Sequence, residues 1–394
     1  MANVSSSNGL EKRPKLRFPG FDEPWKETAL SSVLTERNEY AEKDGTYEHA
    51  TLSKEGIYGK TARYDRDFLV STENKKYKVT HLGDLCYNPA NLKFGVICLN
   101  TYGDAIFSPI YVTFEIDASS DPDFIGAYLT RWDFINRALK YQQGTVYERM
   151  AVSPEDFVSI KCCFPQKAEQ TRLAEFITLL DNRIAAQGKY VESLKKYKRG
   201  LLSNLFSEKS TQGCTTKSYY FSEIAQRRSE KYDPSSGIEY PCVELENIEQ
   251  ETGKILATVP STAQSSIKNI AMSGDTLFGK LRPYLRKYAF AKKTMACSSE
   301  IWALIPSDVV LPKFLFYLVQ TEQFLRVANI SSGTKMPRAE WSNIEKAEFF
   351  IPDFTVQRKV VSLLEGLDQK ITFADSMLFC LNRLKSSLLQ QLFI

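Results

Sequence analysis

Histidine is nearly absent from this sequence, because His49 and His81 are the only two among 394 residues. A histidine-based catalytic triad or metal site therefore has little material. The eight cysteines form no CxxC pair, and none has the spacing of a zinc ligand set. Most stand beside apolar residues, which predicts small buried thiols in a reducing compartment. No GxxxxGK[ST] loop occurs, so an ATP-driven motor is not indicated.

Long apolar runs are also missing. None approaches the roughly 20 residues that a membrane-spanning helix needs, and the polar first ten residues lack the apolar core of a signal peptide. We therefore expect a cytoplasmic protein without membrane contact. The hydrophobic fraction of 43% and the charged fraction of 25% indicate a folded chain. The formal net charge is only +4, so local clusters of charge must identify any nucleic-acid binder.

What the sequence does contain is an internal repeat. Residues 170–206 match residues 357–393 at an offset of 187 positions. The matches include Gln170 with Gln357, Leu180-Asp181 with Leu367-Asp368, Lys198 with Lys385, and Leu205-Phe206 with Leu392-Phe393. Upstream, with small length changes, Gly83-Asp84 matches Gly274-Asp275 and Gly144-Thr145 matches Gly333-Thr334. Two copies of one unit indicate a pseudo-twofold molecule or a tandem array.

Each copy ends in a long helical pattern with one apolar stripe close to a heptad seam. Such a helix needs a partner, and the other copy is the obvious one, so we predict an antiparallel helix pair. The predicted interface consists of Ile184, Val191, Leu194, Leu201, Leu205, Ile371, Leu378, Leu381, Leu388 and Leu392. Asp181 and Asp368 resemble N-caps, so each element is expected to be a short helix, a break and a long helix. At 1.5 Å per residue, residues 181–206 would span roughly 39 Å.

The predicted fold class is α+β, with two similar mixed α/β modules separated by two long antiparallel helices in a pseudo-twofold arrangement. Strand-like runs cover residues 94–99, 110–116, 288–291 and 301–305, and helix-like runs cover residues 123–141 and 311–328. The expected boundaries are a flexible tail (1–16), module 1 (17–165), a helical spacer (166–206), a linker (207–217), module 2 (218–351) and a second helical spacer (352–394).

The sharpest basic patch lies in the second module, where residues 275–293 hold one acid, Asp275. Arginine and lysine can bind DNA phosphates, and arginine can also form a bidentate hydrogen bond with guanine. The predicted contacts are Lys280, Arg282, Tyr284, Arg286 and Lys287. A solvated hairpin is the alternative.

The matching region of the first module begins at Tyr87-Asn88-Pro89. Asparagine can pair with adenine, although Asn-Pro is equally typical of a turn. The candidates for DNA contact here are Asn88, Asn91 and Lys93. Lys75, Lys76 and Lys78 lie just upstream and are candidates for the DNA backbone.

A second pair of loops follows predicted helices at residues 142–149 and 331–338. Each has a glycine, small hydroxyl side chains and a base, so it can offer backbone N–H groups and a cation to a phosphate. The candidates are Thr145, Arg149, Thr334, Lys335 and Arg338. A glycine helix cap followed by a loop is the alternative, and both can hold at once.

Catalytic patterns are weak. Tyr87-Asn88-Pro89-Ala90 matches only part of the Asn-Pro-Pro-aromatic site of adenine methyltransferases, and no glycine-rich cofactor loop precedes it. Asp67, Glu73 and Lys75 loosely imitate a magnesium-dependent nuclease site, but the second copy lacks them. We therefore predict neither catalytic residues nor a metal site.

The repeated Leu-Asp…Ile…Leu…Lys…Leu-Leu…Leu-Phe helices resemble the conserved regions of the specificity (S) subunits of type I restriction-modification enzymes. Residues 14–21, Gly279–Tyr284 (residues 279–284) and Gly333-Thr334…Met336-Pro337 also resemble parts of such chains. The resemblance covers nearly the whole sequence. It implies two target recognition domains, each reading one half of a bipartite asymmetric site in double-stranded DNA, with the helices setting the spacer.

The resemblance also implies partners. Two methyltransferase (M) subunits would dock on the chain, and restriction (R) subunits would join for cleavage. S-adenosylmethionine, ATP and Mg would act in those partners, and no cofactor is expected in this chain. The rival interpretations are a stand-alone DNA methyltransferase or nuclease, and a coiled-coil scaffold that does not bind DNA.

Overall fold

The computed structural model describes residues 12–43, 45–60, 76–144, 150–207, 216–330 and 336–394. The chain forms two compact units, unit 1 (Met1–Ala186 and Leu378–Ile394) and unit 2 (Gln187–Met377). Each unit contains one sheet-rich module, which we call head 1 (residues 26–164) or head 2 (residues 216–352). Each unit also contains one end of both long helices, α4 (Lys167–Leu205) and α9 (Phe354–Leu392). The predicted mixed α/β class is confirmed.

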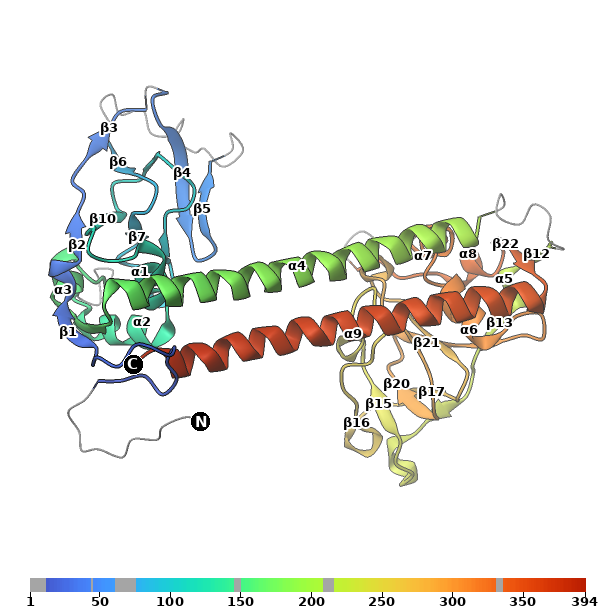
Figure 1. Ribbon diagram of the computed structural model, residues 1–394. Helices are drawn as coiled ribbons and strands as arrows, with labels where there is room; N and C mark the ends of the chain where they lie inside the picture. The colour runs from blue at the N-terminus through green and yellow to red at the C-terminus, as the bar shows by residue number, and fades with distance from the viewer. Residues whose placement is uncertain (1–11, 44, 61–75, 145–149, 208–215, 331–335) are drawn as a thin grey trace. The chain divides into compact units, whose positions relative to one another are not determined.

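Head 1 is built from three small sheets (Figure 1). Their orders are β1-β11, β2-β10-β7-β8 and β3-β6-β9-β4-β5, with β4 and β9 parallel. The strands are β1 (Lys26–Ala29), β2 (Leu34–Glu36), β3 (Tyr40–Ala41), β4 (Glu48–Ser53), β5 (Gly56–Gly59), β6 (Tyr77–Thr80), β7 (Leu85–Tyr87), β8 (Ile97–Leu99), β9 (Ala105–Phe107), β10 (Val112–Ile116) and β11 (Lys161–Phe164).

Head 2 repeats the same three sheets strand for strand. Their orders are β12-β22, β13-β21-β18-β19 and β14-β17-β20-β15-β16, and β15 and β20 form the corresponding parallel pair. The strands are β12 (Thr216–Tyr220), β13 (Ala225–Arg227), β14 (Lys231–Tyr232), β15 (Pro241–Val243), β16 (Val259–Pro260), β17 (Lys268–Ala271), β18 (Thr276–Gly279), β19 (Tyr288–Phe290), β20 (Met295–Cys297), β21 (Ile301–Pro306) and β22 (Glu348–Pro352). The sequence repeat therefore extends through the whole head.

Short helices flank the sheets of both heads. Head 1 has α1 (Pro122–Leu129), α2 (Trp132–Ala138) and α3 (Pro154–Ser159), and head 2 has α5 (Phe221–Ile224), α6 (Pro312–Leu318), α7 (Glu322–Ala328) and α8 (Trp341–Ile344). Each long helical run predicted within a head is thus two helices. Extended backbone at Arg131 and at Thr321 starts the second one, and the Thr321 side chain caps α7 by accepting from the Phe324 N–H.

The core of each unit encloses ends of both long helices. In unit 1, Leu173 and Ile177 near the start of α4 and Leu392 near the end of α9 are buried with Trp25 of head 1. In unit 2, Leu364 near the start of α9 and Leu202 near the end of α4 join the core of head 2. The helix that follows one head in the sequence therefore ends in the core of the other head's unit. Burying its apolar stripe there gives each helix most of its stability.

The expected break in the long helices is wrong. Asp181 and Asp368 lie inside continuous 39-residue helices and are not N-caps. Their carboxylates instead accept from lysines of the other helix. Asp181 pairs with Lys385 in unit 1, and Asp368 pairs with Lys198 at 2.7 Å in unit 2. These are repeat-equivalent pairs, so the repeated aspartate and lysine are explained by contact with each other.

Repeat-equivalent contacts also occur inside the heads. Arg37 donates two hydrogen bonds to Asp84 at 2.9 and 3.0 Å, and Arg228 does the same to Asp275 at 2.6 and 2.9 Å. Each of these aspartates follows one of the matching glycines, Gly83 and Gly274, which both have positive φ. The Gly-Asp match in the sequence therefore marks a turn that is held by a bidentate ion pair.

Two further features bear on the sequence predictions. Residues 12–16 belong to the predicted tail, yet Leu16 donates its backbone N–H to the Gln391 carbonyl at 3.0 Å and Lys12 pairs with Glu27 at 2.9 Å.

Within the described part of the chain, no helix has both the length and the apolar composition required to cross a membrane.

Candidate nucleic-acid interface

The predicted basic loop of head 2 leaves β18 and makes a tight turn. Pro283 begins a single 3-10 turn, and the arginines on either side of this turn, Arg282 and Arg286, both have φ of 51°. Left-handed backbone is costly for a residue with a Cβ and clusters at functional sites. The turn leaves the side chains of Arg282 and Tyr284 exposed, while Pro283 is buried beneath them.

A second predicted loop joins this turn through the backbone. Leu281 and Arg338 form an antiparallel bridge, the Arg282 N–H donates to Pro337 at 2.8 Å, and the Ala339 N–H donates to Lys280 at 2.8 Å. The two basic motifs of head 2 therefore form one surface, although they are more than 50 residues apart in the sequence. Thr334 and Lys335 lie outside the described residues.

The cations of this basic patch, which are close together in the sequence, have different partners in the structure. Lys280 and Arg338 share the carboxylate of Glu300, at 3.9 and 3.1 Å. Arg286 turns away and pairs with Glu322 at 2.7 Å, and the Lys287 ammonium donates to the Leu245 carbonyl at 2.6 Å. Arg286 and Lys287 each have a protein partner in this structure, and the prediction that they face DNA stays a prediction.

The corresponding loop of head 1 also makes a 3-10 turn, but the residue before the turn, Asn91, has φ of -108° where Arg282 is left-handed, and the side chains differ. Its turn ends at Gly95, which has φ of 78°, where head 2 has Arg286. Asn88 is buried and its side-chain oxygen accepts from the Ala90 and Asn91 N–H groups at 3.1 and 3.2 Å. The turn alternative thus applies to Asn88, whose side chain does not face solvent. Asn91 is half-buried and Lys93 is exposed.

The lysines upstream of that loop also differ from one another. Lys76 is exposed, but Lys78 is only 1% exposed and its ammonium contacts Glu36 at 2.9 Å and Asn38 at 3.0 Å. The predicted backbone contact by Lys78 is corrected, because a buried and paired ammonium cannot reach a phosphate. Lys75, Thr145 and Arg149 lie outside the described residues.

Sequence reasoning missed a basic pocket on head 2. It has a volume of about 580 Å³, and Arg227, Arg228, Lys231 and Lys280 line it together with Trp302. Its described lining contains no Asp or Glu. Lys280 belongs both to this pocket and to the basic turn, so the two form one continuous surface. The signal in the sequence was the Arg227-Arg228 pair with Lys231, which is too short to stand out as a charge cluster.

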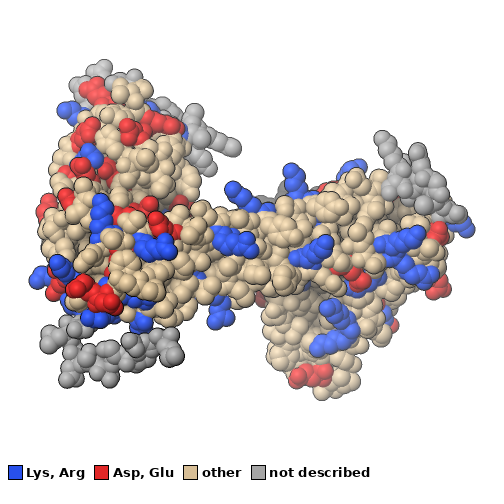
Figure 2. Space-filling view, in the orientation of Figure 1, with Lys and Arg blue, Asp and Glu red and all other residues tan. Residues whose placement is uncertain are grey.

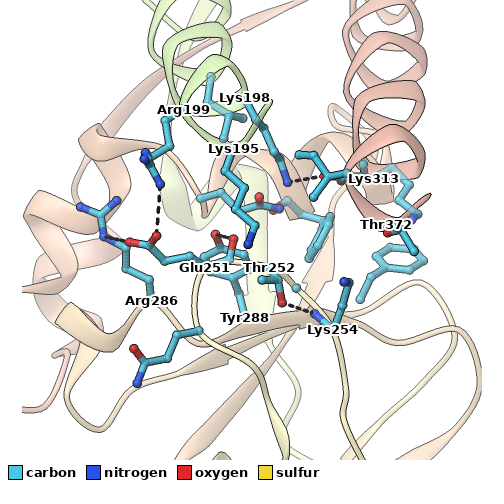
Figure 3. Close-up of a pocket in the computed structure, with 18 of the residues that line it drawn as sticks. Lys195, Lys198, Arg199, Glu251, Thr252, Lys254, Arg286, Tyr288, Lys313 and Thr372 are labelled. Atoms are coloured by element: carbon cyan, nitrogen blue, oxygen red, sulfur yellow. Dashed lines mark hydrogen bonds and ion pairs between the residues drawn. The ribbon is translucent and has the colours of Figure 1, made fainter. Parts of the chain in front are cut away.

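A second pocket of unit 2, about 380 Å³ in volume, has a mixed lining (Figure 3). Glu251 lies between Arg199 of α4, at 3.4 Å, and Arg286, at 3.5 Å. Lys254 reaches Asp375 of α9 at 3.3 Å. Because carboxylates neutralise these cations, the pocket offers little free charge to an anion. The ion pairs instead hold the loop of residues 249–254 against both helices.

The comparisons with known proteins match this architecture. Residues 221–375 match the family model described as the type I restriction modification DNA specificity domain. The chain is 26% identical over 198 residues to the HindI specificity subunit of Haemophilus influenzae, an alignment that covers 45% of this chain and 40% of that protein. It is 23% identical over 248 residues to the MjaVIII specificity subunit of Methanocaldococcus jannaschii, covering 56% and 58% of the two chains. The family model and both relatives therefore indicate similarity to type I restriction-modification specificity subunits.

Two solved structures share the fold of this chain. The S subunit of a type I system from M. genitalium has a TM-score of 0.56 at 16% identity, covering 97% of this chain and 99% of that one. A chain from a study of the assembly and conformational transition of the type I R-M system has a TM-score of 0.58 at 16% identity, covering 96% and 99%. The alignments with the two named relatives span only about half of their length, so their partners and targets are not transferred here.

The ten predicted helix-pair residues are buried or half-buried. Val191, Ile371 and Leu392 are buried, and the other seven are half-buried. Several of them pack on the heads: Leu388 and Leu392 against the core of head 1, and Leu201 and Leu205 against the core of head 2. In unit 2, Gln187 donates to the Ala374 carbonyl at 3.0 Å while Lys198 pairs with Asp368, so the two helix segments run antiparallel. The assignment of each of the ten residues to the pair stays a prediction.

Potentially reactive groups lie mostly in the interior. Burial raises the pKa of Cys98 to about 11 and the pKa values of Cys162 and Cys297 to about 12, so these thiols stay protonated and unreactive at neutral pH. Cys380 is exposed, which departs from the expectation of buried thiols. His49 is buried in head 1, and His81 pairs with Asp104 at 3.0 Å and Glu39 at 3.2 Å. Asp67, Glu73 and Lys75 fall outside the described residues.

Proposed function

We propose that this chain is the DNA-reading, non-catalytic subunit of a type I restriction-modification complex. Each head binds one half of a bipartite asymmetric site in double-stranded DNA. The observation that carries this proposal is the pair of heads with identical strand orders but different side chains at the same turn. Arg282 and Tyr284 occupy that turn in head 2, and Asn91 and Lys93 occupy it in head 1. One scaffold that presents two different sets of donors suits a site with two unlike halves.

The helices supply the second part of the proposal, the spacer. Each is continuous over 39 residues, which corresponds to roughly 58 Å at 1.5 Å per residue. An unbroken helix is stiff enough to fix the gap between two major-groove contacts about one DNA turn, or 34–36 Å, apart.

Partner docking is supported by exposed apolar side chains at repeat-equivalent positions. Tyr190 and Tyr197 of α4 are 51% and 60% exposed, and their counterparts Met377 and Leu384 of α9 are 38% and 49% exposed. Like patches on like helices suit two copies of one partner, the methyltransferase subunits. S-adenosylmethionine, ATP and Mg would act in the methyltransferase and restriction subunits, and the complex would work on DNA in the cytoplasm.

The deciding experiment is co-expression with a methyltransferase partner, followed by mapping of methylated adenines across the genome. The proposal expects a two-part motif with a fixed spacer. A continuous motif, or methylation by this chain without a partner, would favour a stand-alone enzyme. Absence of any salt-sensitive DNA binding with the partner present would favour a scaffold.

A deletion series tests the role of the helices as a ruler. Removal of seven residues from each helix, residues 185–191 and 372–378, keeps the heptad seam and shortens each by roughly 10 Å. The methylated spacer should then shorten by about three base pairs, at 34–36 Å per 10–10.5 base pairs. An unchanged spacer in a folded, active complex would refute this role.

A further inference from the structure

The basic pocket of head 2 holds one cation in a fixed position. The Arg227 guanidinium lies 4.8 Å from the ring centre of Trp341 and 5.7 Å from that of Trp302. Cation–π contact orients the guanidinium while leaving its N–H groups available to a ligand. Trp302 is almost fully buried, so the platform beneath the arginine is part of the core.

The cations of this pocket differ in whether a carboxylate neutralises them. Arg228 is neutralised by Asp275 at 2.6 Å and Glu230 at 3.5 Å. Within the described part of the chain, by contrast, no carboxylate lies within ion-pair distance of Arg227 or Lys231. The Lys231 ammonium donates to the side-chain oxygen of Asn269 at 2.5 Å, a neutral partner that leaves its charge uncompensated. The pocket therefore carries net positive charge in a concave site, which concentrates an electrostatic field.

Head 1 closes the same position. The residue before the bidentate arginine is Arg227 in head 2 and Glu36 in head 1, and Lys231 at the start of β14 corresponds to Tyr40 at the start of β3. In head 1, Lys78 fills the space, paired with Glu36 and lying 5.1 Å from the Tyr40 ring centre. The position is an open pocket with net positive charge in head 2, whereas in head 1 it holds a buried lysine that is paired with Glu36.

The composition of the heads follows the same trend. Residues 26–164 contain 16 Lys and Arg against 20 Asp and Glu, whereas residues 216–352 contain 17 against 15. Acidic side chains lie among the basic ones on the face of head 1 seen in Figure 2. Attraction of a DNA backbone should therefore fall mainly to head 2.

We infer that the pocket of Arg227, Lys231 and Lys280 binds a phosphate of the DNA backbone and makes head 2 the electrostatic anchor of the chain. This inference rests on the proposed DNA-binding function and names the group that the site takes. A phosphodiester fits better than a base edge, because the cations line a concave pocket, whereas base readout needs side chains that project into a groove.

The test measures the salt dependence of DNA binding with a duplex of arbitrary sequence, using the full-length chain with its methyltransferase partner. Each phosphate contact contributes roughly 0.9 to the slope of log K against log salt. Arg227→Ala should therefore lower the slope by roughly 0.9, which removes a factor of about 3.5 from the affinity change between 50 and 200 mM salt. Arg227→Lys keeps the charge and should retain the slope.

The matched control is Lys293→Ala. Lys293 is exposed and follows β19, at the edge of the four-stranded sheet opposite β13, and it lies outside the pocket lining. It should leave the slope unchanged. An unchanged slope in Arg227→Ala, or an equal drop in Lys293→Ala, would overturn the phosphate site.

Sequence discrimination separates this inference from a base-reading role. The ratio of affinities for the mapped motif and for arbitrary DNA should be the same in Arg227→Ala and in the unaltered chain. A reduced ratio with an unchanged slope would assign Arg227 to base readout and overturn the inference. The proposed function fails separately, by the absence of a two-part methylated motif, because the slope is measured on arbitrary DNA.

Discussion

At the position where head 2 places Arg227 over two tryptophans, head 1 has Glu36 paired with a buried lysine. The strands that carry these residues have the same order and the same partners in both heads. The two heads also share a bidentate ion pair at the glycine turn, Arg37–Asp84 in head 1 and Arg228–Asp275 in head 2. The comparison teaches that this ion pair and the sheets maintain the shared backbone of the heads, while side chains at other positions of that backbone are free to differ in charge.

The largest expected difference concerns the helix ends. Phe393 is 4% exposed and packs against Trp25, Phe124 and Tyr128 of head 1 at 5.6–6.4 Å between ring centres. Its repeat equivalent, Phe206, is only half-buried and packs on Phe314 at 4.8 Å. Phe393→Ala should destabilise unit 1 by about 3–5 kcal/mol because it leaves a cavity.

Phe206→Ala is the matched comparison and should cost about 1–2 kcal/mol in unit 2, since less area leaves water. Hydrogen exchange combined with denaturant unfolding would report the two units separately. Equal losses in the two variants would contradict the view that the two helix ends differ in burial.

A smaller difference is expected between the two repeated ion pairs. The Lys198 side chain is 8% exposed and its partner Asp368 also accepts from the Tyr317 hydroxyl at 2.9 Å. Lys385 and Asp181 are 28% and 49% exposed. Lys198→Met should therefore cost about 2 kcal/mol, because it leaves a partly buried carboxylate without its cation.

Lys385→Met should cost less than about 1 kcal/mol, as is usual for an exposed pair. The free energy of unfolding from denaturant titration measures both variants. A larger loss in Lys385→Met would show that burial does not set the strength of these pairs.

The smallest expected effect is a pH dependence confined to head 1. Burial disfavours the charged form of His81, but hydrogen bonds to Asp104 and Glu39 outweigh it and raise the pKa above its usual value. The pairing therefore stabilises head 1 fully below pH about 6.5, the value in the unfolded chain, and is lost as the pH rises through the raised pKa. Head 2 has Met272 at this position.

His81→Met should accordingly remove a small fall in Tm between pH 6 and pH 8.5. Thermal unfolding of the variant and the unaltered chain at both pH values makes the comparison. A Tm difference that persists in His81→Met would assign the pH dependence to other groups.

Much of the fold followed from the repeat. The matched Asp181/Asp368 and Lys198/Lys385 positions form real pairs, although the sequence favoured helix caps for the aspartates. The long helices end at Leu205 and Leu392, which are the leucines of the repeated Leu-Phe pairs. The strand runs of residues 110–116 and 301–305 contain β10 and most of β21. Repeats and periodicity are local properties of the chain, so they can be detected without coordinates.

The candidate site was less predictable. Lys78 and Arg286 were candidates for DNA contact because lysine and arginine cluster near them in the sequence, and their acidic partners lie far along the chain. Glu36 is 42 residues from Lys78, and Glu322 is 36 residues from Arg286. Arg227 was missed because the residues that hold its guanidinium, Trp302 and Trp341, also lie far from it in the sequence.

The sequence by itself determined that this protein has two copies of one unit, that each copy ends in a long amphipathic helix, and which positions of the copies correspond. Only the tertiary structure decided that each helix ends in the core of the other copy's unit, and which cations remain unpaired. The physical reason is that helical periodicity is encoded by neighbours in the chain, whereas neutralisation of a charge depends on distance through space. Residues tens of positions away can supply the carboxylate that removes a lysine from a binding surface.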